Sequence, residues 1–112
     1  MSYNGWSNYQ TWCANLWIDN DEYLYNHWRR MAQESWNDSE SGLHSTREDN
    51  AIRTLADSLQ SWIEEQASES VGSSGMLSDL LTSAVGMVDC REIAEHWIAD
   101  VDKEEEEEEE EE

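Results

Sequence analysis

Apolar residues recur at intervals of three or four along most of this chain of 112 residues, and no proline interrupts them. The clearest run follows Ser45 and Glu48, which form a capping box at the start of a helix predicted to end near Gln66. Because an α-helix has about 3.6 residues per turn, this spacing places the apolar side chains on one face. The positions on that face are Ala51, Ile52, Leu55, Ala56, Leu59, Trp62 and Ile63.

Four other segments have the same period and are also predicted to be helices. They cover residues 8–19, 21–36, 76–88 and 90–101. Ser7 or Asn8 is expected to cap the first of them, and Asp89 with Glu92 repeats the capping box before the last. Two stretches rich in Ser, Gly, Asn or Asp separate the helices as loops, at residues 37–44 and 67–75. The sequence therefore predicts an all-α fold, a compact bundle of about five short helices forming one domain over residues 1–102.

The apolar stripes of these helices are expected to face a common core, which would bury most of the seven tryptophans. Trp6 and Trp36 are the exceptions, and we expect them to lie outside the inward stripes. In the first helix the stripe consists of Tyr9, Trp12, Cys13, Leu16 and Trp17. In the fourth helix the inward positions are Leu77, Leu80, Leu81, Ala84, Val85 and Val88.

The charge of the chain excludes several classes of partner. Asp and Glu number 27 against 6 Lys and Arg, which gives a formal net charge of −21. A surface this acidic opposes direct binding to nucleic acid or to an anionic membrane, because both require cations. No apolar run approaches the ~20 residues that cross a bilayer, and the first residues do not form a signal peptide. The expected location is therefore the cytoplasm.

The last nine residues, Glu104 to Glu112, are all glutamate. Adjacent like charges repel one another, so residues 103–112 are predicted to form a solvated, disordered tail. Without these nine charges the rest of the chain still carries −12. The predicted helical domain is therefore acidic in its own right.

No motif in the sequence indicates catalysis, a metal site or a cofactor. Glu92 and His96 are four residues apart on one helix, but such a pair is more often a surface contact than a metal site. Cys13 and Cys90 do not form a C-x-x-C pair and are expected to be small buried hydrophobes. The acidic residues near Asp19 do not follow the spacing of a calcium loop, and helix capping accounts for them better. We therefore predict a protein that is not an enzyme.

Two segments resemble a known group of proteins. The opening N-G-W-S-N-Y-Q-T-W-x-x-x-L-W-I-D-N-D, from Asn4 to Asp21, is similar to that of a family of small uncharacterised proteins of phages, plasmids and some bacteria and archaea. The segment C-R-E-I-A-E-H, from Cys90 to His96, resembles the closing helix of the same family. The resemblance implies no activity and no catalytic residues. It does imply a mobile-element origin, which favours a protein that acts on host machinery.

These observations lead to the hypothesis of a DNA mimic, an inhibitor that occupies the nucleic-acid site of a basic host protein. Helices hold carboxylates at fixed spacings, as a nucleic-acid backbone holds phosphates. The target would be a restriction, CRISPR or recombination nuclease, RNA polymerase or a transcription factor. The inhibitor would act as a monomer or homodimer in the host cytoplasm. The candidate partner-binding residues of the helical part are Asp19, Asp21, Glu22, Glu34, Asp38, Glu40, Glu64, Glu65, Glu69, Asp100 and Asp102. The tail adds Glu104, Glu105, Glu106, Glu107 and Glu108.

Two alternatives remain open. A protein from a halophilic host is acidic for reasons of solvation, and this chain has a single lysine, Lys103. In that case it is a small protein-interaction module, and Trp6 and Trp36 are the candidates for an exposed aromatic patch. The third hypothesis, a tail that binds divalent cations, ranks last because consecutive glutamates form no cage around an ion.

Overall fold

The computed structural model of the chain describes residues 5–71 and 75–103. Within these residues it contains five α-helices and no β-strand, which confirms the predicted all-α fold. Of the tail predicted at residues 103–112, residues 104–112 lie outside the described residues, whereas Lys103 is not part of a solvated tail, because it pairs with Glu48 at 3.5 Å. The helices are α1 (Tyr9–Asn20), α2 (Glu22–Asp38), α3 (Arg47–Val71), α4 (Met76–Gly86) and α5 (Cys90–Ala99).

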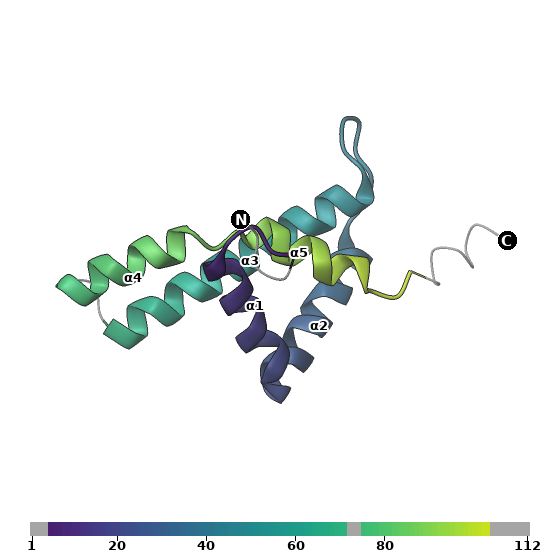
Figure 1. Cartoon of the computed structure of the whole chain (residues 1–112). Helices are drawn as coiled ribbons and strands as arrows, with labels where there is room; N and C mark the ends of the chain where they lie inside the picture. The colour runs from purple at the N-terminus through teal and green to yellow at the C-terminus, as the bar shows by residue number, and fades with distance from the viewer. Residues whose placement is uncertain (1–4, 72–74, 104–112) are drawn as a thin grey trace, which may run out of the picture.

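α3 organises the fold, because α2, α4 and α5 all pack against it. Its first half lies against α2 and α5, whereas its second half pairs with α4 and projects away from the other helices (Figure 1). We call residues 60–71 of α3 together with α4 the α3–α4 arm. The main contacts of α1 are with α2 and α5, so α1 and the arm leave the centre of the molecule in different directions (Figure 1).

The buried core lies between the first half of α3 and the helices around it. The apolar face predicted for α3 is found there, and Leu55 and Leu59 are each only 1% exposed. Burying a side chain of this size contributes ~1.5–3 kcal/mol. The other helices complete the core with Ile18 from α1, Trp28, Ala32 and Trp36 from α2, and Cys90, Ile93, Ala94 and Ile98 from α5.

The structure corrects the predicted cap of α3. The helix begins at Arg47, and Thr46 rather than Ser45 caps it. The Thr46 Oγ1 accepts a hydrogen bond from the backbone N–H of Asp49 at 3.0 Å. Thr46 is therefore the residue that satisfies an unpaired N–H of the first turn.

The other end of α3 also differs from the prediction. The helix continues to Val71, so residues 67–71 are helical and do not belong to a loop. Ala67 and Val71 line a groove together with Leu81 and Val85 of α4. The composition of residues 67–71 favours a loop, but pairing with α4 supplies apolar contacts that stabilise the extra turn.

The structure also corrects the prediction of which face of α1 is buried. The stripe predicted to face the core is largely exposed: Trp17 is 71%, Tyr9 48% and Leu16 39% accessible. The helix instead buries the opposite side, where Thr11 is 0% and Ile18 1% exposed. Of the predicted stripe, Trp12 does pack against the core and Cys13 is half-buried, so the prediction was wrong for Tyr9, Leu16 and Trp17.

The exposure of α4 and of two tryptophans also differs from the prediction. Leu77 and Leu80 of α4 were expected to point inward but are 61% and 60% exposed, because α3 covers α4 from one side. Conversely, Trp6 and Trp36 are buried, at 9% and 6% exposure. They therefore provide no exposed aromatic patch.

Two cations lie against the ring of Trp36, which belongs to the buried core. The Arg47 guanidinium lies 4.3 Å from the centre of the Trp36 ring, and the Lys103 ammonium lies 4.8 Å from it. Arg47 also donates two hydrogen bonds to the Trp36 carbonyl, at 3.1 and 2.9 Å. These contacts close the end of α2 against the start of α3.

Hydrogen bonds fix the first turn of α1 to the segment between α4 and α5. Asn8 caps α1 by accepting from the Thr11 N–H at 2.8 Å, and its side-chain amide donates to the Met87 carbonyl at 2.7 Å. The Thr11 hydroxyl accepts from the backbone N–H of Asp89 at 2.8 Å. Asp89 in turn caps α5, as predicted, by accepting from the Glu92 N–H at 3.0 Å. We call Asn8, Thr11, Met87 and Asp89 the junction cluster.

The residues before α1 continue this attachment along α5. The Ser7 backbone N–H and hydroxyl both donate to the Glu92 carboxylate, the hydroxyl at 2.7 Å. The ring of Trp6 lies 4.1 Å from that of His96, between centroids. The Glu92 carboxylate therefore binds the N-terminal segment. It does not complete a second capping box with Asp89, as the sequence had predicted.

Replacing Thr11 by Val tests the junction cluster. Val keeps the shape of Thr but removes the acceptor of the Asp89 N–H, so we expect a loss of about 1–3 kcal/mol in the free energy of unfolding. In a domain of this size that corresponds to a fall in Tm of at least ~4 °C. Thr54→Val, at an exposed position of α3, is the matched control and should change Tm by less than ~2 °C. Equal effects of the two substitutions in thermal denaturation would contradict the assignment.

Candidate functional site

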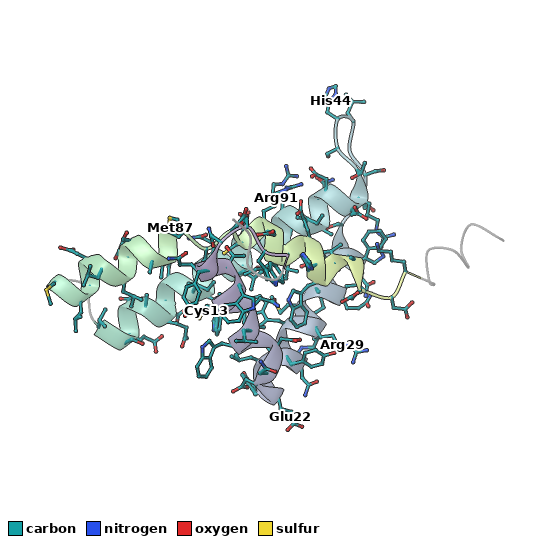
Figure 2. All side chains as sticks on the ribbon, viewed as in Figure 1. Cys13, Glu22, Arg29, His44, Met87 and Arg91 are labelled. Carbon is teal, nitrogen blue, oxygen red and sulfur yellow. The ribbon has the colours of Figure 1, made fainter. Side chains whose placement is uncertain are left out.

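The predicted partner-binding carboxylates within the described residues are all on exposed residues, but they fall into groups of different character. The first group is at the turn between α1 and α2, where Asp19, Asp21 and Glu22 lie within four residues of one another. Asp21 caps α2 by accepting from the Leu24 N–H at 2.9 Å. Figure 2 shows Glu22 at the tip where the two helices meet. We call these three residues the acidic corner.

The second group lies on the α3–α4 arm and consists of Glu64, Glu65 and Glu69. The Glu64 carboxylate accepts a hydrogen bond from Gln60 at 2.7 Å, which is a contact within one helix. Residues 54–90 contain six Asp and Glu and no Lys or Arg. The arm and its base are therefore negative with no cation of their own to neutralise them.

The third group, Glu34, Asp38 and Glu40, lies in the last turns of α2 and just after its end. Arg30 forms an ion pair with Glu34 at 3.8 Å. Nearby on α3 and α5, Lys103 pairs with Glu48 at 3.5 Å, and Arg91 bridges Asp49 and Glu95. Exposed pairs of this kind contribute only ~0–1 kcal/mol to stability, but they reduce the local negative potential.

The charges of the molecule are consequently segregated. Residues 1–28 and 54–90 contain no Lys or Arg, and all six cations lie in residues 29–53 and 91–103. The packing of α5 on the first half of α3 brings these two cationic segments together. The arm extends away from that region (Figure 1), whereas Arg29 and Arg30 lie on α2 and line the same pocket as Asp19 of the acidic corner. The six cations are Arg29, Arg30, Arg47, Arg53, Arg91 and Lys103.

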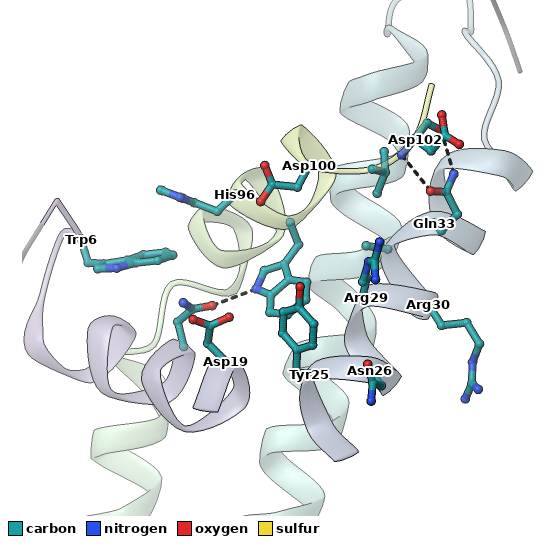
Figure 3. A pocket seen from close by; sticks show the side chains of 14 residues that line it. Trp6, Asp19, Tyr25, Asn26, Arg29, Arg30, Gln33, His96, Asp100 and Asp102 are labelled. Atoms are coloured by element: carbon teal, nitrogen blue, oxygen red, sulfur yellow. Dashed lines mark hydrogen bonds between the residues drawn. The ribbon is translucent and has the colours of Figure 1, made fainter. Parts of the chain in front are cut away.

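Asp19, Asp100 and Asp102 are brought together at a pocket of about 640 Å³ between α1, α2 and α5. Its aromatic walls come from Trp6, Tyr25 and Trp97. Figure 3 shows Asp19 and Asp100 facing the pocket from different elements, while Arg30 points away.

Side-chain hydrogen bonds hold the walls of this pocket in place. The Trp97 Nε1 donates to the Asn15 side chain at 2.8 Å. Gln33 donates to the Asp102 carbonyl at 2.9 Å and accepts from the Asp102 N–H at 2.8 Å. Arg29 and Arg30 are also among the lining residues, so this pocket is of mixed charge. The lining residues are spread over most of the chain, so no local motif indicates the pocket.

In the structure the Glu92 carboxylate binds Ser7, and the His96 ring lies against that of Trp6 at a tilt of 31°. Among the described residues no three His, Cys, Asp or Glu side chains are grouped as metal ligands would be. In the same part of the chain, none of the helices has both the length and the apolar character needed to cross a membrane.

A family of unknown function (DUF7249) matches residues 1–109. The chain belongs to this family. Both segments that carried the resemblance lie within the match, and the structure places them in contact: Ser7 and Trp6 of the opening segment touch Glu92 and His96 of the closing one. No curated protein and no solved structure matches the chain. DUF7249 assigns no activity, so a function for this member has to be argued from its surface.

The charge of Glu64, on the arm, is one of the causes that raise the pKa of Cys90 at the start of α5. Burial is the main cause that raises the pKa of the Cys90 thiol from 9.0 to about 11, and the charges of Asp89 and Glu64 add to it. Between pH 9 and about pH 11 the Cys90 thiol therefore stays protonated in the folded chain, whereas it is ionised in the unfolded chain. The stabilising effect is complete below pH 9 and is lost as the pH rises toward about 11.

We expect Cys90→Ala to reduce the decline in stability between pH 8 and pH 11, because the variant lacks the thiol that must ionise on unfolding. The measurement is the urea midpoint of unfolding across this range. Cys13→Ala is the control, at the other cysteine, which is half-buried on α1. If both variants lose stability with the same pH slope as the parent protein, Cys90 does not have the raised pKa.

Proposed function

We propose that this member of DUF7249 is a non-enzymatic inhibitor, encoded by a phage or another mobile element, that mimics DNA. It would occupy the nucleic-acid site of a basic host protein in the host cytoplasm, and it would bind neither nucleic acid nor a membrane itself. The observation that carries the proposal is the segregation of charge: the acidic corner and the α3–α4 arm have no cation of their own. Candidate targets are restriction, CRISPR or recombination nucleases, RNA polymerase and transcription factors.

The geometry of α3 from Asp57 to the end of the arm supports this reading. Asp57 and Glu69 lie twelve residues apart on α3, which corresponds to ~18 Å along the helix. That length equals about five steps of ~3.4 Å along one DNA strand. Glu65 and Glu69, at positions i and i+4, have side chains ~6 Å apart on the same face. A protein surface that spaces Lys and Arg to meet phosphates would find carboxylates at comparable intervals here.

Salt dependence of capture tests the proposal directly. The full-length protein and a chain ending at Lys103 are immobilised, exposed to host lysate and eluted with steps of NaCl. We expect nucleic-acid-binding proteins to elute as the salt rises, because the attraction between exposed charges is screened. Comparison of the two chains measures the contribution of the glutamate tail. Retention that does not change with ionic strength would contradict mimicry.

Two triple variants test the arm against a captured partner. We expect the arm variant to weaken binding about tenfold at 50 mM NaCl, since three exposed charge contacts at ~0.5 kcal/mol each amount to that factor. The control removes the same number of charges from carboxylates that already pair with cations, and it should change affinity less than twofold. The arm variant replaces Glu64, Glu65 and Glu69 by Gln. The control variant replaces Glu34, Glu48 and Glu95 by Gln.

Stability at low salt separates mimicry from adaptation to a salty cytoplasm. A mimic acts at ordinary ionic strength, so we expect the protein to remain folded in 50 mM NaCl. Salt adaptation instead predicts that the unscreened repulsion of the acidic surface unfolds the chain. Circular dichroism at 50 mM and 2 M NaCl distinguishes the two: helix that forms only at the higher concentration would favour the halophilic alternative.

A further inference from the structure

The exposed face of α1 consists of side chains that a helix ordinarily buries. Tyr9, Cys13, Leu16 and Trp17 occupy positions i, i+4, i+7 and i+8 and share one side of the helix. Trp17 is 71% exposed, Tyr9 48% and Leu16 39%. Figure 2 shows Cys13 on the side of α1 away from α2. We call these four residues the α1 stripe.

α1 contacts the rest of the molecule through its other side, where Thr11 and Ile18 are buried, and through the junction cluster. The Trp17 ring therefore exposes most of its apolar surface to water in the free protein. Exposed Trp and Tyr side chains are the residue types that most often contribute the large energies at protein interfaces.

The surroundings of the α1 stripe define the charge of its occupant. The stripe runs directly into the acidic corner, and Asp19 is two residues after Trp17. The last turn of α1 has no basic residue. No Lys or Arg is present anywhere in residues 1–28. An occupant of this face therefore meets apolar side chains along the helix and negative charge at its end.

We propose that the α1 stripe binds the apolar face of an amphipathic helix on a basic partner. Trp17 is the apolar anchor, and the acidic corner binds the Lys or Arg residues that flank the apolar face of the partner helix. This inference rests on the proposed function, since it specifies how the basic partner is held. A second copy of the chain fits less well, because residues 1–28 of that copy offer no Lys or Arg to the acidic corner.

Defined peptides test the proposal without knowledge of the natural partner. The probe is a fluorescently labelled helical peptide of 18 residues with a leucine stripe flanked by lysines. Its isomer has the same composition but distributes the leucines around the helix. We expect the first peptide to bind the full-length protein at least tenfold more tightly than the isomer in fluorescence anisotropy at 150 mM NaCl. Equal binding of the two would show that charge alone is recognised and would overturn the proposal.

Substitutions in the chain locate the contact. We expect Trp17→Ala to weaken binding of the amphipathic peptide about tenfold and to leave the slope of log Kd against log salt unchanged, because the lost contact is apolar. Asp19→Asn with Glu22→Gln should instead reduce that slope; Asp21 is kept because it caps α2. Leu43→Ala is the control, at a 93% exposed apolar residue outside the helices. It should have no effect on binding.

The remaining outcomes each decide a separate question. Unchanged circular dichroism of Trp17→Ala is expected, since Trp17 is an exposed residue, and it rules out unfolding as the cause of weaker binding. Sedimentation that shows a dimer dissociated by Trp17→Ala would overturn the proposal in favour of a second copy. A loss of peptide binding in Trp17→Ala, together with no effect of the arm variant on a captured host protein, would retain the docking surface and reject DNA mimicry.

Discussion

The arrangement of this molecule depends on a few polar contacts that hold α1. The Thr11 hydroxyl and the Asn8 side chain bind the Asp89 N–H and the Met87 carbonyl, so one cluster joins the first helix to the end of α4 and the start of α5. These groups are partly buried, where an unmade hydrogen bond costs more than a made one contributes. Together with Ile18, which is buried in the core, these polar bonds fix α1 from its inner side, so Trp17 and Leu16 on the other side remain exposed.

This constraint explains where prediction from the sequence succeeded and where it failed. The face of α3 was predicted correctly because Leu55 and Leu59 belong to an apolar stripe whose opposite side is polar. In α1 the same reasoning identified a real stripe, but periodicity does not say whether a stripe faces the protein or the solvent. The deciding residue is Thr11, and its partners lie 76 and 78 positions further along the chain. The burial of Trp6 and Trp36 was missed for the same reason, since His96, Arg47 and Lys103 cover them from other elements.

The candidate site was predictable in its charge and not in its arrangement. The sequence shows that two stretches lack cations, but only the packing of α5 on α3 brings cations of the closing segment to carboxylates of α3. That packing pairs Arg91 with Asp49 and Lys103 with Glu48, and it leaves the arm and the acidic corner without such partners. The pocket lined by Asp19 and Asp100 depends on three helices and on Trp6, and no sequence spacing encodes such a meeting.

Charged and apolar surfaces have different roles in recognition, and on α1 the two kinds of surface lie next to each other. Exposed carboxylates accelerate association with any basic surface, and salt weakens that effect. They do not select one basic protein among many, since every nucleic-acid-binding cleft presents cations. Selection requires contacts that the wrong partner cannot make, and desolvated aromatic contacts also slow dissociation. A mimic that had only the arm would bind many basic proteins and would dissociate from each of them quickly. The adjacency of Trp17 and the acidic corner provides, in one short segment, both the attraction and the means to discriminate.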